Sequence, residues 1–264
     1  SDALSNLASP GVMGGAVIVV GEDYGEGASV IQERTHAFAL KSALWLLDPR
    51  PNLTSIVHLV EKAFELSEAS NTPVMVELRI RTCHVQGSFK TKNNQAPAIS
   101  SVHLQKNPPA FNYDRLSHPP STFAHEKLKY ESRMPAARRF IMEEGLNEQW
   151  TGESLGVGLI VQGGLYNTLI RALEELSLTD EQGESRLPLL VLNVVYPLVP
   201  EQIQKFCAGK QGVLVLEEGQ PEFIEQEIAT HLQRSGIQVS LHGKDVLPMG
   251  GEYNAEVLVR GLTK

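Results

Sequence analysis

The chain contains few cysteines, and this scarcity excludes several kinds of site. Cys83 and Cys207 are the only two in 264 residues. Two are too few for a disulfide framework, a Cys-x-x-Cys metal site or an iron–sulfur cluster. One disulfide would fit the count, but a reduced pair in a cytoplasmic protein is the expected state. No metal site is therefore predicted within this chain.

Long apolar runs and basic patches are also lacking. No apolar stretch reaches membrane-spanning length, and the first residues show no signal-peptide pattern. The formal net charge is −8, and Lys and Arg are not interleaved with aromatic residues. Nucleic acids and anionic membranes both require basic surfaces. We therefore expect neither as a partner.

What is present is a composition typical of globular proteins. Apolar residues make up 42% of the chain and charged residues 20%, which is enough apolar material for a packed core. The length is compatible with one large domain or two of ordinary size.

The first third shows the alternation of a βαβ unit. Residues 15–20 are a continuous run of apolar and β-branched residues, typical of a strand covered on both faces. Helical spacing follows over residues 35–47 and again over 54–67. Residues 74–80 then form a second buried strand, which we expect to pair in parallel with the first.

The middle of the chain has a different character. Prolines punctuate a polar stretch over residues 89–152, and the clearest helix is expected at 121–143. Such a length is uncommon for an idle loop, so it predicts a connection between domains. We place the boundaries at 1–95, 96–152 for the linker, and 153–264.

The last hundred residues alternate regularly between strand and helix. This pattern predicts an α/β fold with open, mostly parallel sheets and helices on both faces, in two domains joined by the long connection. The predicted strands are residues 156–161, 187–195, 212–216 and 237–241, and the helices are 166–176, 201–206 and 222–234.

Ligands of open α/β sheets bind beyond the carboxyl ends of the strands, and the first such loop is rich in glycine and carboxylates. Glu22, Asp23 and Tyr24 lie between Gly21 and Gly27. A loop that faces a substrate or cofactor and a solvated turn are both compatible with this composition, because glycine serves close backbone approach as well as turns.

The second strand ends in Arg81, Cys83 and His84. Arg81 could hold a carboxylate and His84 could transfer protons near neutral pH. Cys83 beside His84 could suggest a nucleophile, but neighbouring strand residues point to opposite faces, so the two need not meet. A buried structural cysteine is the stronger expectation. His36 could face a ligand, although packing within its helix is the stronger expectation.

Two further strand ends are weaker candidates. Gly163 and Gly164 are best explained by a tight turn from strand to helix, because no dinucleotide or P-loop pattern accompanies them. Glu217 and Glu218 are expected at an interface or in solvent rather than in catalysis. No Ser/His/Asp arrangement and no cluster of metal ligands is apparent, so the catalytic residues remain unknown.

Several stretches resemble one enzyme family. Residues 21–39 (GEDYGEGASVIQERTHAFA) and 79–84 (RIRTCH) are similar to the pyrimidine-type domain of 2-oxoacid:ferredoxin oxidoreductases, especially the indolepyruvate branch. Residues 196–198 (YPL) and 213–218 (VLVLEE) resemble the transketolase C-terminal-like domain of the same enzymes. Both regions occur in the family's order and together cover about two-thirds of the chain.

The resemblance implies a thiamine-diphosphate enzyme with Mg and iron–sulfur clusters. Such an enzyme decarboxylates arylpyruvates oxidatively, passes electrons to ferredoxin and forms an acyl-CoA, usually as a homo-oligomer. It also implies that the cofactor-activating carboxylate precedes Ser1 and that the diphosphate-binding domain follows Lys264. On this interpretation the remaining domains or a partner subunit hold the cofactors, and this segment alone holds none and is inactive.

One departure and two alternatives remain. The family's Ser-Ser-Gln-Asn stretch is replaced by residues 28–31 (ASVI), which removes polar groups and leaves the substrate open. A β-type subunit of a 2-oxoacid dehydrogenase, or a transketolase relative, would share both domain types. A non-catalytic assembly module would use the second domain only for dimerisation or docking.

Overall fold

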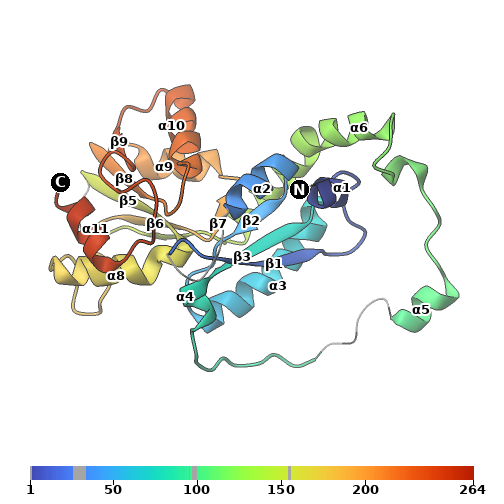
Figure 1. Ribbon diagram of the computed structural model, residues 1–264, viewed down its shortest axis with the longest axis horizontal. Helices are drawn as coiled ribbons and strands as arrows, with labels where there is room; N and C mark the ends of the chain where they lie inside the picture. Colours follow the sequence, from blue (N-terminus) through green and yellow to red (C-terminus); the bar gives the residue numbers. More distant parts are fainter. Residues whose placement is uncertain (1, 26–33, 95, 97–99, 154–155) are drawn as a thin grey trace.

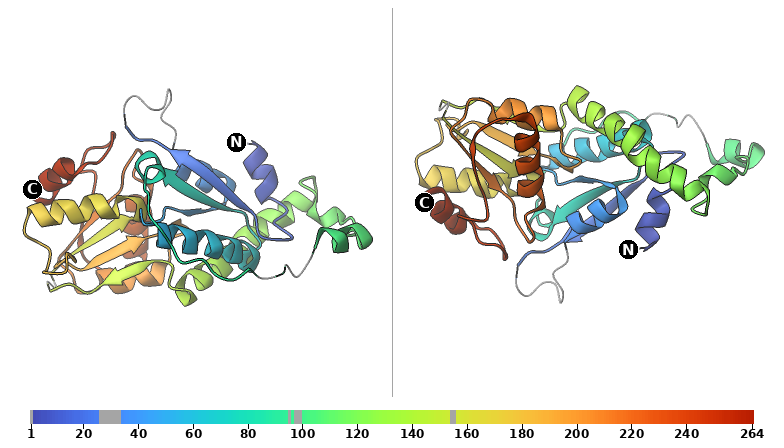
Figure 2. Two further views of the ribbon diagram at one scale, coloured as in Figure 1. Left: turned by 90° about the horizontal axis from the view of Figure 1, so that it is seen from below. Right: turned by 90° about the horizontal axis from the view of Figure 1, so that it is seen from above.

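The computed structural model describes residues 2–25, 34–94, 96, 100–153 and 156–264. The fold contains two sheets that lie side by side, each with helices on both faces (Figures 1 and 2). Five of the seven strand pairings are parallel. The predicted α/β class with mostly parallel sheets is therefore confirmed, with antiparallel strands added at an edge of each sheet.

The first sheet has the strand order β1-β3-β2-β7. β1 (Val17–Glu22) pairs in parallel with β3 (Val74–Arg79), as expected, and β3 pairs in parallel with β2 (Trp45–Leu47). β7 (Val194–Tyr196) is antiparallel to β2. Because β7 comes from the last third of the chain, the first sheet is completed only by a distant segment.

The predicted helix over residues 35–47 is too long. α2 (Thr35–Ser42) ends where Ala43 adopts the left-handed conformation, with φ of 53°. The chain then enters β2, whose residues are fully buried. The sequence alone does not distinguish a short apolar run in a buried strand from one in a helix. Residues 45–47 form a strand because they lie inside the sheet and are buried on both faces.

The next helix is close to its prediction. α3 (Leu53–Ser70) begins at Asn52, whose Oδ1 accepts the Ser55 N–H at 3.2 Å. It ends at Asn71 in the left-handed conformation. A side-chain cap at the start and a left-handed residue at the end satisfy the free backbone groups of the terminal turns. The N-cap of α3 is thus Asn52.

The second sheet has the order β4-β6-β5-β8-β9. Four parallel strands were expected here and four are present, but the single strand predicted over residues 187–195 is wrong: residues 189–192 form β6 of this sheet, whereas β7 belongs to the first sheet. β4 lies antiparallel at the edge and was not expected. The strands are β4 (Glu148–Trp150), β5 (Val157–Gln162), β6 (Leu189–Leu192), β8 (Gly212–Leu216) and β9 (Ser240–His242). The helices around it are α8 (Tyr166–Glu175), α9 (Pro200–Cys207), α10 (Phe223–Ser235) and α11 (Ala255–Leu262).

Successive residues of these strands pack into two different apolar cores, one on each face of the sheet. In β5, Leu159 and Val161 pack with α8 and α11, whereas Ile160 packs on the side of α9 and α10. In β8, Leu214 and Leu216 alternate with Val213 and Val215 in the same way. This is the two-residue period of a strand that is covered on both faces.

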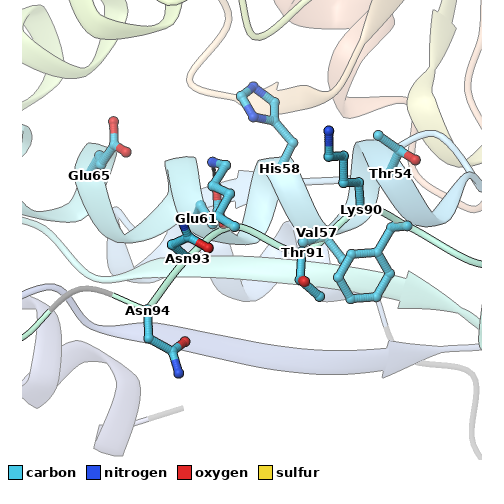
Figure 3. A pocket seen from close by; sticks show the side chains of 11 residues that line it. Thr54, Val57, His58, Glu61, Glu65, Lys90, Thr91, Asn93 and Asn94 are labelled. Atoms are coloured by element: carbon cyan, nitrogen blue, oxygen red, sulfur yellow. Dashed lines mark hydrogen bonds and ion pairs between the residues drawn. The ribbon is translucent and has the colours of Figure 1, made fainter.

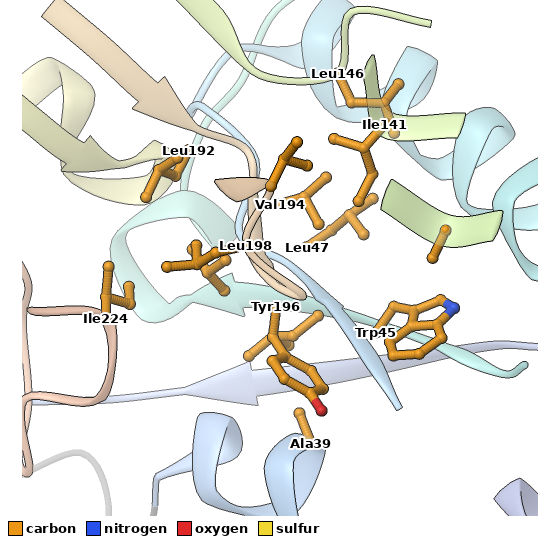
Figure 4. Packing of buried hydrophobic residues seen from close by; sticks show 14 of the residues in the cluster. Ala39, Trp45, Leu47, Ile141, Leu146, Leu192, Val194, Tyr196, Leu198 and Ile224 are labelled. Carbon is orange, nitrogen blue, oxygen red and sulfur yellow. The ribbon is translucent and has the colours of Figure 1, made fainter. Parts of the chain in front are cut away.

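One apolar core joins the two sheets. Figure 4 shows Leu47 of β2 beside Val194 and Leu198 from the last third of the chain, in an apolar cluster that also contains Trp45 and Ile224. These side chains are at most 1% exposed. The two halves of the chain are therefore connected by apolar packing as well as by the β2–β7 pairing.

The middle of the chain is mostly helical. α7 (Met134–Glu143) buries Ala137 and Ile141 in the core shared by the sheets and packs on α3. α5 (Ser101–Lys106) instead extends away from both sheets (Figure 1). The other helices near this region are α1 (Asp2–Ala8), α6 (Ser121–Leu128), a 3-10 turn at Tyr113–Arg115 and a π-helical turn at Lys129–Arg133. No helix within the described ranges is long and apolar enough to cross a membrane.

Candidate functional site

A buried group of charged residues lies where the carboxyl ends of both sheets meet. We call it the junction cluster. Its members come from β1 and the loop that follows it, from β3 and α4 (Ile80–Cys83), and from the residues just before α2, just after β2 and just after β8. The members are Glu22, Tyr24, Arg34, Asp48, Glu77, Arg79, Arg81, Glu217 and Glu218.

Arg79 is the centre of the junction cluster. Its Nη2 donates to Asp48 Oδ2 at 2.5 Å within the first sheet, and its Nη1 donates to Glu218 at the end of β8. All three side chains are at most 1% exposed. Two carboxylates and a planar guanidinium fit one another well. Arg79 therefore bridges the two sheets.

The glycine pair after β5 makes room for this bridge. The Gly164 N–H donates to Asp48 Oδ1 at 3.1 Å. A Cβ on Gly164 would lie 2.2 Å from Arg79 Nε, and one on Gly163 would lie 2.0 Å from the Asp48 carbonyl oxygen. The tight turn predicted here is confirmed, and it also allows close approach of the two halves of the chain.

Arg34 makes the second bridge. Its Nη2 donates to Glu217 Oε1 at 2.6 Å and its Nη1 donates to the Pro221 carbonyl at 3.0 Å. Glu217 Oε2 accepts the N–H groups of Ile224 and Glu225 at the start of α10. Burial raises the pKa of Glu217, and Arg34 and these N–H groups oppose that rise. The carboxylate thus caps a helix as it pairs across the junction.

Arg81 is the most accessible cation of the junction cluster, with 25% of its side chain exposed. It donates to Glu218 Oε1 at 2.6 Å, to the Tyr253 carbonyl at 2.8 Å and to Thr168 Oγ1 at 3.2 Å. Its Nε lies 3.5 Å from Glu252. Arg81 therefore connects α4 to β8 and to the start of α11 at the rim of the cluster.

The structure brings Glu22 and Tyr24 of the predicted glycine-rich loop into the junction cluster. Both carboxylate oxygens of Glu22 accept the Thr35 N–H at 3.1 Å. The Tyr24 hydroxyl donates to Glu77 Oε1 at 3.3 Å, and the Arg79 guanidinium lies 5.2 Å from the Tyr24 ring centre. Asp23 is half-buried and accepts the Gly25 N–H at 2.9 Å. Glu26, Gly27 and the ASVI stretch at 28–31 lie outside the described residues.

The two predicted histidines have different positions. His36 is 1% exposed, 5.3 Å from the Phe223 ring, and neither ring nitrogen has a hydrogen-bond partner. Burial, with a contribution from Arg34, lowers the pKa of His36 to about 3. His84 is exposed at the end of α4. The expected packing role suits His36, and His84 is not brought into the junction cluster.

Of the two places expected for Glu217 and Glu218, an interface or solvent, the structure has the interface: they lie between the two sheets and are 1% and 0% exposed. One expectation is wrong. Cys83 is exposed rather than buried. The reason is that β3 ends at Arg79 and residues 80–83 form a helical turn, so the alternation of a strand does not apply there.

Sequence reasoning also missed three of the buried charges. Asp48 follows the apolar run of β2, and Glu77 and Arg79 interrupt the apolar pattern of β3. Charged residues inside a strand that is otherwise apolar are rarely buried unless they are paired. This signal was available, but it does not identify the partners, which lie far away in sequence.

The described residues do not form a metal site. No group of three or more His, Cys, Asp or Glu in the described ranges is placed to hold a metal ion. Cys83 is exposed and Cys207 buried, and both are unpaired. The charges of the junction cluster are engaged with one another. These residues therefore do not fit Mg or an iron–sulfur cluster.

A separate cavity of about 690 Å³ lies on the outer side of α3 (Figure 3). Its wall is the helix face that carries Val57, His58 and Glu61 together with residues 89–94. Lys92 forms an ion pair with Glu61 across it. None of the lining residues belongs to the junction cluster.

No family model matches the chain. Indolepyruvate oxidoreductase subunit IorA from Methanothermobacter thermautotrophicus is 28% identical over 269 residues, and that from Pyrococcus abyssi is 26% identical over 271 residues. Both alignments cover the whole chain. The chain is a homologue of part of these subunits. It spans 41% and 39% of their respective lengths.

Solved structures agree at the level of the fold. A 2-oxoglutarate:ferredoxin oxidoreductase from Magnetococcus marinus matches with a TM-score of 0.61 and 14% identity, over the whole chain and 51% of that protein. A split-gene transketolase, solved as an inactive beta4 tetramer, matches with a TM-score of 0.55 and 13% identity, over 99% of the chain and 69% of that protein. The resemblance seen in the sequence is confirmed by these similarities.

Proposed function

We propose that this chain is part of a thiamine-diphosphate-dependent 2-oxoacid:ferredoxin oxidoreductase that acts on arylpyruvates such as indolepyruvate. The observation that carries the proposal is the similarity of the whole chain to indolepyruvate oxidoreductase subunits. In this reaction the bond to the carboxylate breaks and CO₂ leaves. A thioester to CoA forms, and two electrons pass to ferredoxin through iron–sulfur clusters.

Because the described residues do not fit the metal groups, we assign the cofactors to other parts of the enzyme. Thiamine diphosphate supplies the carbanion chemistry, and a protein must hold and orient it. We propose that the remaining domains or a partner subunit do so, and that this segment alone is inactive. Homo-oligomerisation and a cytoplasmic location stay predictions.

Within that enzyme we assign residues 1–95 to the end of the pyrimidine-type domain and 153–264 to the transketolase C-terminal-like domain. Residues 96–152 connect them. The junction cluster then fixes the angle between the two domains. Glu22, Tyr24 and His36 are buried, so we give them a positioning role. We keep Asp23, Arg81 and His84 as candidates that face substrate or cofactor.

The test is an anaerobic assay of the full-length protein with its partner subunit. Indolepyruvate should reduce ferredoxin or methyl viologen only when CoA and thiamine diphosphate are present, with indoleacetyl-CoA as product. Failure with indolepyruvate and with other arylpyruvates and 2-oxoacids, in a complex shown to contain its clusters, would overturn the proposal. The non-catalytic assembly role would then be the better explanation.

A variant tests whether Arg81 faces the substrate. Arg81→Gln in the same complex should raise the KM for the oxoacid if Arg81 faces its carboxylate. The matched control is Arg171→Gln on the exposed side of α8, which should leave the KM for the oxoacid unchanged. An unchanged KM for Arg81→Gln would remove this residue from the list of substrate-facing candidates.

A further inference from the structure

The end of β1 and the start of α2 are tied to each other. Glu22, the last residue of β1, accepts the Thr35 N–H at 3.1 Å with both carboxylate oxygens. Thr35 is the first residue of α2 and comes 13 positions later in the sequence. Both residues are buried. The loop that follows β1 therefore leaves the first sheet and returns to it at one place.

Arg34 fastens this place to the second sheet. It directly precedes α2, and only 8% of it is exposed. Its guanidinium donates to Glu217 Oε1 at 2.6 Å and to the Pro221 carbonyl at 3.0 Å. It also lies over two rings, 5.8 Å from the centre of Tyr24 and 5.5 Å from that of Phe223. Arg34 thus contacts both the loop that contains Tyr24 and the segment that follows β8.

Gly219 makes a second contact between the same two segments. Its φ is +82°, in the left-handed region that glycine adopts without strain. A Cβ at this position would lie 2.5 Å from Tyr24 Cε1 and 2.9 Å from Arg34 Nη1. The backbone after β8 approaches both side chains this closely because Gly219 has no side chain of its own.

The accessible rim of the junction cluster lies next to this loop. A Cβ on Gly25 would lie 3.0 Å from Glu252 Oε2 and 3.3 Å from Asp23 Oδ1. Glu252 Oε1 in turn lies 3.5 Å from Arg81 Nε. Asp23 is half-buried and the Arg81 side chain is 25% exposed, so both remain accessible to a ligand. A shift of residues 22–25 therefore changes the surroundings of both candidates.

We propose that Arg34 and Gly219 are positioning residues of the candidate site. Through them the segment after β8 holds residues 22–25 where Asp23 and Arg81 face the substrate. The inference rests on the proposed function, because it gives these residues a part in binding the 2-oxoacid. Both act through the loop and not by contact with the oxoacid, so their loss should weaken binding more than it slows the chemical step.

The test compares two glycine variants of the full-length protein in complex with its partner subunit. Gly219→Ala should raise the KM for indolepyruvate about tenfold and change kcat less than about twofold, because small displacements of binding groups are costly. Gly209→Ala is the matched control. Its φ is +76°, and apart from its chain neighbours no described residue has an atom within 4 Å of a Cβ added there. Both variants carry similar backbone strain, but only Gly219→Ala should raise the KM.

Variants of the charge pair give a second test, which decides the inference if Gly219→Ala does not fold. Arg34→Gln and Glu217→Gln should each raise the KM for the oxoacid. The double variant should raise it no further than the larger single effect, because both changes remove the same contact. Arg34→Lys keeps a cation opposite Glu217 and should recover most of the loss. Additive effects on KM, or no recovery with lysine, contradict a positioning role for this pair.

Hydrogen exchange of the same proteins provides a measurement that does not require turnover. Gly219→Ala should speed exchange in peptides that contain residues 17–25 and 34–42, whereas Gly209→Ala should leave them as in the parent. Equal exchange in the two variants overturns the inference. If the parent complex is active and Gly219→Ala keeps its KM, the positioning role alone is wrong. If the parent turns over no oxoacid, the proposed function fails, and the exchange rates still decide whether Gly219 holds the loop.

Discussion

The second sheet and the junction cluster are held together in different ways. In the second sheet, successive apolar residues of β5, β6 and β8 alternate between two cores, one on each face of the sheet. In the junction cluster, the decisive contacts join residues 183 and 139 positions apart, Arg34 to Glu217 and Arg79 to Glu218. The sheet therefore depends on local periodicity, and the junction on long-range charge pairs.

The largest difference between the two regions should appear on removal of Arg79. Arg79→Met leaves Asp48 without its cation and Glu218 with Arg81 alone, and breaking a buried pair costs about 3–5 kcal/mol. We expect the free energy of unfolding in urea to fall by that amount. Arg171→Met on α8 is the exposed control and should change it by less than about 0.5 kcal/mol. A fall below about 1 kcal/mol would show that water replaces the bridge.

This contrast explains how much of the fold could be predicted. The strands and helices of the last hundred residues follow their hydrophobic period, and β5 and β8 appear within one residue of their expected positions. β2 could not be recognised, because three buried residues that follow a helix show no period. β4 and β7 are edge strands whose pairing depends on distant partners.

The site was predictable only in part. The loop with Glu22 and Tyr24 and the strand end near Arg81 were identified, because strand carboxyl ends carry function in this fold class. Arg79 and Asp48 were missed, because an isolated charge in an apolar strand does not reveal which distant charge will neutralise it. Burial of Glu217 and Glu218 follows from the packing of the two sheets, which no local pattern describes.

The second prediction concerns His36, which borders the junction. The folded pKa of His36, lowered to about 3, is below its unfolded value of about 6.5. Stability from the neutral ring is therefore complete above pH 6.5 and is lost as the pH falls toward 3, at about 1.4 kcal/mol per unit. At pH 5 the titration of His36 should have lowered the free energy of unfolding of the parent by about 2 kcal/mol.

His36→Leu removes the titrating ring and keeps an apolar side chain against Phe223. The loss of unfolding free energy between pH 7 and pH 5 should be about 2 kcal/mol smaller in this variant than in the parent. His58→Leu, at an exposed position of α3, should leave the pH dependence unchanged. If both variants behave alike, His36 is hydrated in the folded protein.

The third prediction tests the apolar side of the comparison. Ile160→Val removes one methylene from a side chain that is 0% exposed in β5. The surrounding side chains relax little, so the expected cost is about 1 kcal/mol of unfolding free energy. Val157→Ala, at the exposed start of the same strand, provides the comparison for strand propensity. If Ile160→Val lowers the free energy of unfolding more than Arg79→Met does, apolar packing in the second sheet contributes more to stability than the charge pairs of the junction cluster.

The smallest effect should come from a charge pair outside the junction. Lys127 and Glu131 lie 3.7 Å apart on the α6 side of the molecule, and each side chain is 62% exposed. Water solvates both groups whether or not they meet, so Lys127→Ala should lower the free energy of unfolding by no more than about 0.5 kcal/mol. High salt should abolish even that difference. A cost comparable to that of Arg79→Met would mean that charge pairing itself, rather than burial at the junction, determines the stability of this protein.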